Sequence, residues 1–276
     1  MRKIVCSDGA HQTESVPTLT VRDGRALVQL NRPTRHNCIG PQDIEAFQQI
    51  LSRVEKDQTV RVLVLTGAGR TFCAGYNLHS LAPGNLRASR KKTLDDAYAF
   101  TQLVNRLETF RAPTICGLNG PVYGGGSDLA LACDFRLAVR RATMLIPVSR
   151  FGIHYYHGGL LRLATRLGLG ASKRLLLFGQ PIDAEEMLRI GFLDEVVTTP
   201  ERLRQRMDTL ANIIANAPVP AVLSGMKRDL NRIAKGDMDS TATDLAWAES
   251  VLSPAVAIAA AEQTTARSRR REPRRT

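Results

Sequence analysis

Two short runs of apolar residues constrain the fold of this chain more than any other feature of its sequence. Residues 60–66 read VRVLVLT and residues 113–118 read PTICGL, and each run leads into a glycine-containing turn. Short apolar runs of this kind are typical of strands that are buried on both faces of a parallel sheet. Helical stretches at 94–110 and 129–133 alternate with them, followed by a strand-like run at 135–139. This alternation predicts an α/β fold with right-handed crossovers.

The segments on either side of this core predict a hairpin before it and helices after it. Two β-rich runs are separated by Asp23-Gly24, which is typical of a tight hairpin turn. Pro41 suits the first position of an amphipathic helix, and from residue 158 onward the pattern is mainly helical. We divide the chain into a flexible N-terminal arm (1–16), an α/β core (17–198), a helical C-terminal region (199–265) and a basic, disordered tail (266–276).

Composition narrows the class of protein. No stretch reaches eighteen consecutive apolar residues, so we expect no membrane span, and the N-terminal apolar run is too short for a secretory signal. The five cysteines are scattered and form no C-x-x-C pair. We therefore expect neither a disulfide framework nor a zinc site, no bound metal, and a cytoplasmic location.

The formal net charge of +12 is partly concentrated at the C-terminus. Residues 267–276 carry six arginines and one glutamate, and the rest of the chain is still basic. This tail fits either a solvated segment or a contact with a polyanion such as RNA. Because no aromatic residues are interleaved with the arginines, nucleic acid is the less favoured partner. The basic remainder suits an anionic small-molecule ligand.

Two glycine-containing segments directly follow the two buried strands. Residues 72–78 read FCAGYNL, and residues 120–129 read GPVYGGGSDL and run into a helix. Ligands of open α/β sheets bind at the carboxyl ends of the strands, where both segments are expected. Backbone N–H groups that converge from two such loops would form an oxyanion hole. The alternative is that the glycines only permit tight turns.

Taken together, the motifs of this chain resemble those of the crotonase (enoyl-CoA hydratase/isomerase) superfamily over about residues 18–235. The matching segments, in the order of the family, are 31–33 (NRP) with Asn37, 72–78 (FCAGYNL), 124–134 (GGGSDLALACD), 158–160 (GGL) with Leu163, 173–175 (KRL), 182–184 (IDA), 191–192 (GF) and 195–197 (EVV). The resemblance implies a spiral of ββα turns with a helical C-terminal region, assembled as a homotrimer or hexamer. It also implies an acyl-CoA thioester as substrate, a role of the kind found in fatty acid metabolism, and no cofactor besides the CoA of the substrate.

The resemblance also assigns the site. It places the two oxyanion-hole donors at the N–H groups of Tyr76 and Gly125, where they would stabilise the enolate of a thioester. The substrate would further contact the loop residues Ala74, Asn77, Gly124 and Val148. Asn77 stands where the family often has aspartate. Arg32 and Arg35 flank the early loop that contacts the nucleotide end of CoA in family members, with solvated arginines as the alternative.

The acid and base positions depart from the hydratase pattern. Family hydratases use two glutamates; Asp128 matches the first of them, and Val148 occupies the place of the second. Valine transfers no proton, which favours isomerase or lyase chemistry over two-glutamate hydration. Tyr156 matches a third position that some family isomerases use, and His154 lies in the same aromatic segment. The alternatives are that Asp128 only stabilises its helix and that the aromatic segment only packs.

Three further residues have both a functional and a structural interpretation. Cys73 precedes the hole and is a conceivable nucleophile, although no histidine partner is placed beside it. Lys227 and Arg228 could face CoA phosphates or only solvent. The functional prediction is an acyl-CoA-processing enzyme of the enoyl-CoA hydratase/isomerase type. The alternative is a non-catalytic acyl-CoA-binding homologue that keeps the hole but has lost the base.

Overall fold

The computed structural model describes residues 14–77 and 90–237, together with isolated positions between 239 and 249. Most of the predicted N-terminal arm and the whole of the predicted basic tail lie outside the described residues. Within the described part, strands and helices alternate as the sequence predicts. A six-stranded sheet forms the centre of the molecule, and a smaller sheet lies beside it.

The large sheet contains the two apolar runs as neighbouring parallel strands. Its strands, in spatial order, are β1 (Thr18–Arg22), β2 (Arg25–Leu30), β3 (Val62–Gly67), β4 (Thr114–Leu118), β6 (Phe135–Val139) and β9 (Glu195–Val197). All neighbours are parallel except β1 and β2, which form the predicted hairpin. Asp23 and Gly24 both have positive φ, as a two-residue turn that follows the twist of the strands requires.

The spiral of ββα turns is confirmed. After β4 the chain forms the two-residue strand β5 (Val122–Tyr123) and helix α3 (Gly125–Leu131), and after β6 it forms β7 (Thr143–Leu145) and helix α4 (His157–Lys173). Each turn thus gives one strand to the large sheet and one to the small sheet, which β8 (Ile182–Asp183) completes in the order β5-β7-β8. These short second strands were not predicted individually, because two or three residues carry no periodicity.

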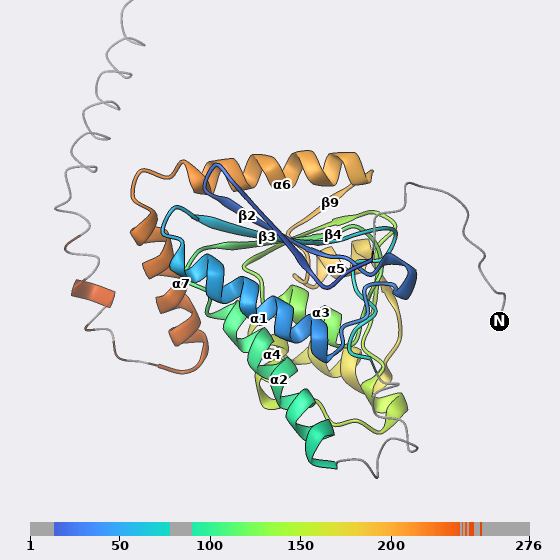
Figure 1. The fold of residues 1–276 in the computed structure, drawn as a ribbon. Coiled ribbons are helices and arrows are strands. Elements are labelled where there is room, and N and C mark those ends of the chain that lie inside the picture. The colour runs from blue at the N-terminus through green and yellow to red at the C-terminus, as the bar shows by residue number, and fades with distance from the viewer. Residues whose placement is uncertain are drawn as a thin grey trace, which may run out of the picture.

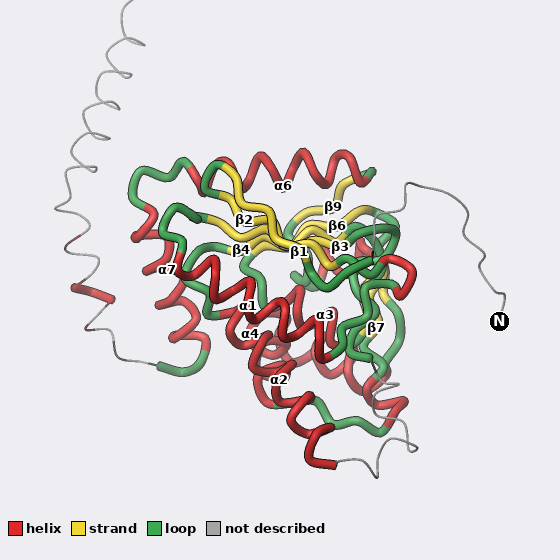
Figure 2. The backbone as a smooth tube through the Cα atoms, in the orientation of Figure 1, coloured by secondary structure: helices red, strands yellow, loops and turns green. Residues whose placement is uncertain are grey.

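Helices cover both faces of the large sheet. The remaining helices are α1 (Pro41–Lys56), α2 (Arg90–Glu108), α5 (Ala184–Arg189), α6 (Pro200–Ala215) and α7 (Pro220–Ala234), with a π-helical segment at Arg174–Phe178 and 3-10 turns at Pro33–Arg35 and Val148–Phe151. Figure 1 shows α6 along one face and α1 to α4 on the other, and the tube in Figure 2 shows the sheet between these two layers. The apolar side of α6, which includes Leu203, Met207 and Ala211, is buried.

The C-terminal helices are held by polar contacts as well. Lys227, considered above as a ligand contact or a solvated residue, is 8% exposed; its Nζ lies 2.8 Å from a carboxylate oxygen of Asp134 and donates to the carbonyl of Ala112. Lys227 therefore anchors α7 to the core instead of facing solvent. Within the described residues, no single helix has the length and apolar content to cross a membrane; only α6 and α7 taken together do, and they meet at 106°.

Close packing of α6 on the sheet depends on Gly117 of β4. A Cβ atom at this position would lie 2.0 Å from Sδ of Met207, so Gly117→Ala forces Met207 or the helix away. We expect this variant to lose about 2 kcal/mol of unfolding free energy, as overpacking in a core typically does. Gly225→Ala in α7 is the control, because a Cβ there meets nothing within 4 Å and alanine favours a helix. The urea concentrations at the unfolding midpoints of the two variants measure this difference. Equal midpoints would show that α6 does not depend on a glycine at position 117.

Candidate functional site

The two glycine-containing loops lie against each other, as their positions after neighbouring strands predict. The N–H of Tyr123 donates to the carbonyl of Cys73 at 2.9 Å, and the N–H of Phe72 donates to that of Pro121 at 3.0 Å. Cys73 and Val122 form an isolated parallel bridge that extends the small sheet. The first loop is therefore fixed beside the start of α3.

Gly75 brings the two predicted oxyanion donors into the same region. It has a φ of +86°, and a Cβ at this position would lie 2.6 Å from the carbonyl oxygen of Tyr123 and 3.2 Å from the amide nitrogen of Gly125. Only glycine fits this approach. Gly125 is the first residue of α3, and its N–H donates to no acceptor in the described part of the chain. Unpaired N–H groups of this kind mark a helix N-terminus, where the helix dipole favours negative charge.

Two buried asparagine side chains hold the loops in place. Asn37, which belongs to the motifs named above, donates to the carbonyls of Ala68 and Thr71 at 2.9 and 2.8 Å and accepts the N–H of Arg32. Asn119, which was not singled out, accepts the N–H of Gly67 and donates to the carbonyl of Gly69 at 2.8 Å. Buried amides with every partner in place fix the backbone around them. The position of Asn119, directly after an apolar strand, was the signal that could have identified it.

Asp128 lies one turn along α3 from Gly125 and is 1% exposed. Its two carboxylate oxygens receive Nε and NH2 of Arg162 at 2.9 and 2.8 Å, in the paired geometry that makes arginine–carboxylate contacts strong. The hydroxyl of Tyr156 donates to Oδ2 of the same carboxylate. It also accepts from NH2 of Arg162 at 3.0 Å, and the guanidinium lies over the Tyr156 ring. The predicted residues Asp128 and Tyr156 are therefore in direct contact.

Arg162 and Glu108 complete this cluster, and neither was predicted as a site residue. Arg162 is 2% exposed, and its NH1 group reaches the side-chain oxygen of Asn105 at 2.9 Å and Oε2 of Glu108 at 3.3 Å. The only sequence signal was an arginine one turn after the first residues of α4, on a face where apolar residues would be expected. We call Glu108, Asp128, Tyr156 and Arg162 the buried charge cluster.

Burial and charge set the protonation of the cluster. Burial, followed by the charge of Asp128, raises the pKa of Tyr156 above its usual range, so the phenol stays neutral near pH 7. The same two causes raise the pKa of Tyr155, whose ring stacks on Tyr156. Burial alone would lower the pKa of Arg162, but its hydrogen bonds and charge pairing with Asp128 outweigh this effect and raise it. Arg162 is thus a permanent cation that holds an anion beside it.

The other predicted residues divide into those near the loops and those away from them. Val148 begins the 3-10 turn Val148–Phe151 and packs partly buried against the core. Gly124 has a φ of +50° at the entry to α3. Ala74 and Asn77 are tied by their N–H groups to the carbonyls of His36 and Ile39. His154 is exposed, and its Nδ1 lies 2.7 Å from the carbonyl oxygen of Tyr155.

The predicted nucleotide contacts differ from each other. Nε of Arg32 lies 2.8 Å from Oδ1 of Asp43, whose other carboxylate oxygen caps the start of α1, so this guanidinium already has an anionic partner. Arg35 is exposed. The ring of Tyr76 meets the edge of the Phe100 ring at a centroid distance of 6.0 Å. Phe100 is buried, and it also lies in the direction of a Cβ at Gly125.

Among the described residues, no group of three or more His, Cys, Asp or Glu side chains is arranged to hold a metal ion. The thiol of Cys73 is also enclosed. It donates to the carbonyl of Asn37 at 3.2 Å and accepts the N–H of Gly75 at 3.3 Å. Burial raises the pKa of Cys73 to about 12, so its contacts position the loop and give no reactive thiolate.

This enclosure predicts the reactivity of Cys73. At pH 7.5 a thiol with a pKa near 12 is ionised in fewer than about 1 in 10⁴ molecules, so iodoacetamide should leave Cys73 unmodified in the folded protein. The half-buried Cys38 serves as the internal comparison. Peptide mass spectrometry before and after unfolding in urea measures both sites, with the unfolded chain as the fully labelled control. Rapid labelling of folded Cys73 would restore the nucleophile hypothesis.

Comparison with known proteins places this chain in a family. A family model described as enoyl-CoA hydratase/isomerase matches residues 20–252. A short-chain-enoyl-CoA hydratase from Clostridium acetobutylicum is 33% identical over 216 residues, which cover 78% of this chain and 80% of that protein. A 1,2-epoxyphenylacetyl-CoA isomerase from Escherichia coli is 31% identical over 220 residues, covering 80% and 83%.

Solved structures agree with the sequence relatives. The crystal structure of an enoyl-CoA hydratase/isomerase from Marinobacter aquaeolei superposes with a TM-score of 0.77 at 26% identity, and the match covers 94% of this chain and 98% of that one. The fold is thus shared with a solved structure from the group to which the sequence relatives belong. The chain belongs to the enoyl-CoA hydratase/isomerase family, that is, to the crotonase superfamily.

Proposed function

We propose that this protein is an acyl-CoA enzyme that stabilises a thioester enolate between the N–H groups of Tyr76 and Gly125, and that it acts as an isomerase or lyase. The observation that carries the proposal is the approach of the two loops at Gly75, which brings the backbone before Tyr76 to the start of α3. Charge accumulates on the thioester oxygen when an α-proton leaves. Amide donors aimed at that oxygen typically lower the barrier by about 3 kcal/mol each.

Proton transfer is assigned to Tyr156 and Asp128 acting together. The carboxylate of Asp128 is buried, whereas Tyr156 is only partly buried and is the outer member of the pair. The substrate proton moves to the Tyr156 oxygen while the phenolic proton moves to Oδ2 of Asp128, and the C–H electron pair becomes the enolate. The reverse transfer delivers the proton to another carbon, which shifts the double bond with no net change in protons.

Val148 supports isomerisation or lyase chemistry over hydration. A hydratase of this family needs a second carboxylate to orient the attacking water, and the side chain of Val148 offers no acceptor for its proton. Relatives bearing both hydratase and isomerase names match this chain over similar lengths, so the names of relatives leave the reaction class open.

The non-catalytic alternative is favoured by one observation. Both oxygens of Asp128 are occupied, by Arg162 and by Tyr156, so this carboxylate already has its hydrogen-bond donors. A chain that binds acyl-CoA in the same place but moves no proton would show this arrangement. The two candidates differ in whether the α-hydrogen of a bound thioester exchanges.

Hydrogen exchange in D₂O separates the candidates. We expect saturated and unsaturated acyl-CoAs to gain deuterium at the acyl chain when the proton held by the partly buried Tyr156 exchanges with D₂O before it returns to carbon. We also expect 3-enoyl-CoAs to convert to their 2-enoyl isomers, while hydration of 2-enoyl-CoAs stays near background. Mass spectrometry and absorbance at the enoyl thioester band measure these reactions. If calorimetry detects acyl-CoA binding but no substrate exchanges, isomerises or is cleaved, the binding homologue is the better description. Efficient hydration would overturn the isomerase or lyase assignment.

The oxyanion site has its own test at Gly75. In Gly75→Ala, the new methyl group would collide with the Tyr123 carbonyl and push the loops apart, so we expect turnover to fall about 100-fold with a smaller change in KM. Gly152→Ala is the matched control. It also introduces a side chain at positive φ, but its Cβ meets nothing within 4 Å. Similar losses in both variants would point to backbone strain in general instead of the hole.

A further inference from the structure

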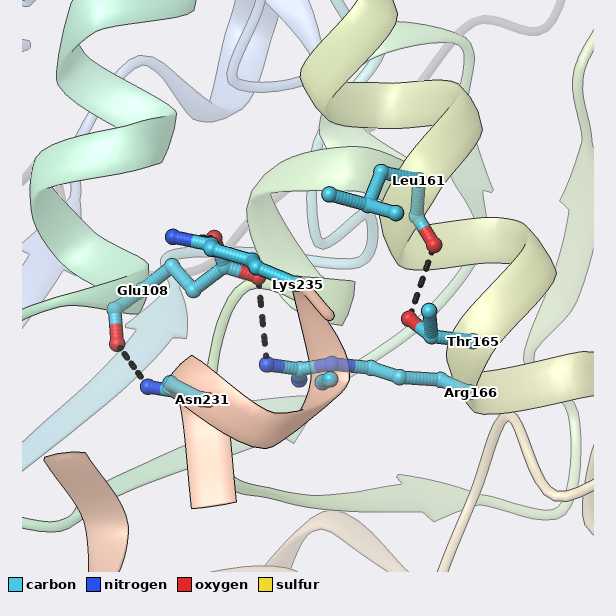
Figure 3. Close-up of a pocket in the computed structure, with 7 residues that line it drawn as sticks. Glu108, Leu161, Thr165, Arg166, Asn231 and Lys235 are labelled. Atoms are coloured by element: carbon cyan, nitrogen blue, oxygen red, sulfur yellow. Dashed lines mark hydrogen bonds and ion pairs between the residues drawn. The ribbon is translucent and has the colours of Figure 1, made fainter. Parts of the chain in front are cut away.

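Glu108 ends α2 with its carboxylate enclosed between α4 and the end of α7 (Figure 3). Its Oε2 lies 3.3 Å from NH1 of Arg162 and 3.4 Å from Nζ of Lys235, and its Oε1 lies 3.5 Å from NH2 of Arg166. The backbone carbonyl of Glu108 accepts a hydrogen bond from the side chain of Asn231 at 3.0 Å. A single carboxylate thus faces three cations beside a cavity of about 70 Å³.

Arg162 is shared between this carboxylate and that of Asp128. Its Nε and NH2 groups face Asp128, and its NH1 group faces Glu108. The guanidinium is 2% exposed, so water cannot compensate its charge. A buried cation that loses its anion is destabilised strongly, which means that Arg162 needs a second anion whenever Asp128 is neutral.

We propose that Glu108 is a positioning residue for Asp128, because it keeps Arg162 paired with an anion while Asp128 holds a proton. Lys235, at the end of α7, partly neutralises the charge of Glu108. The inference rests on the proposed proton relay, in which Asp128 is protonated in every turnover. Glu108 pairs with Arg162 and not with Asp128, so it acts on Asp128 through the guanidinium of Arg162. The C-terminal helix α7 is thereby coupled to the carboxylate beside the oxyanion loops.

The surrounding charges give the coupling a definite sign. Within the described residues, Tyr155, Tyr156 and Arg162 are the titratable or charged groups that face Asp128. Glu108 in turn faces the cations of Arg162, Arg166 and Lys235 named above. Removing the Glu108 charge leaves the field of Arg162 uncompensated at Asp128, which makes protonation of Asp128 harder. Removing the Lys235 charge has the opposite effect.

A double-mutant cycle tests the coupling without any assay of turnover. In Glu108→Gln or Asp128→Asn alone, Arg162 keeps one anion; in the double variant it has lost both. We expect the urea midpoint of the double variant to fall by more than the sum of the two single changes. The matched control cycle combines Asp128→Asn with Glu55→Gln, because Glu55 pairs with Arg106 between α1 and α2 and does not contact Arg162. Additivity in both cycles would overturn the proposal.

The pH dependence of kcat/KM tests the positioning role, which a merely structural contact would not move. We expect the acid limb of the plot of kcat/KM against pH to shift to lower pH in Glu108→Gln. In Lys235→Met it should shift to higher pH and by a smaller amount, because the half-exposed Lys235 is partly screened. Glu55→Gln should leave the limb in place. Unmoved limbs, or shifts of the same sign in both cluster variants, would overturn the positioning role.

The two experiments keep this inference distinct from the proposed function. If the wild-type protein turns over no acyl-CoA, the proposed function fails by itself, and the unfolding cycle alone decides the coupling. If the double-mutant unfolding cycle is non-additive and the acid limbs of Glu108→Gln and Lys235→Met move in opposite directions, both the coupling of Glu108 to Asp128 and the proton relay are supported.

Discussion

The buried cation of Arg162 is the constraint on which the geometry of the site depends. Removing a charge from water costs several kcal/mol, and only well-placed anions and acceptors offset this cost. Those partners come from three places in the chain: Glu108 ends α2, Asp128 lies in α3, and Tyr156 directly precedes α4. Because α3 also begins with Gly125, the requirement to pair Arg162 helps to fix the direction in which the Gly125 N–H points. The buried charge cluster and the proposed oxyanion site are therefore parts of one arrangement.

The same physical logic holds the other loop at a smaller scale. Asn37 and Asn119 are buried amides whose side chains bond backbone groups at the end of β3 and in the loop that follows it. Apolar burial decides that the sheet is covered by helices on both faces, but it is tolerant of small shifts along a strand. Hydrogen bonds are directional, so they do not tolerate such shifts. In this protein the hydrophobic core determines how the helices cover the sheet, and the buried polar side chains determine the exact position of the loops.

This division explains what the sequence could and could not predict. Strands β3 and β4, the hairpin at Asp23 and the two glycine-containing loops have local signals in composition and spacing, and the structure contains them. Strands β5, β7 and β8 are too short to have a period and are fixed by pairing with distant segments. The burial of Arg162 and Lys227 was not predicted, because the burial of a charge can be explained only when its anion, far along the chain, is known. The contact of Tyr156 with Asp128 was invisible for the same reason, although both residues were named from family positions.

For the proposed enzyme, the number of groups that can accept or donate a proton limits the reaction. Hydration must add water across a double bond, so one group has to take a proton from water while another delivers one to carbon. With Val148 at the second acidic position, the relay of Tyr156 and Asp128 is left to do both. A double-bond shift needs less, since the proton that leaves one carbon is returned to another and the relay ends each turnover in its starting state. While that proton is held, Asp128 is neutral and the negative charge resides on the enolate, so Arg162 would lose its nearest anion were Glu108 not behind it. A site with one relay and a reserve anion is therefore suited to moving a proton within a substrate rather than to adding water to it.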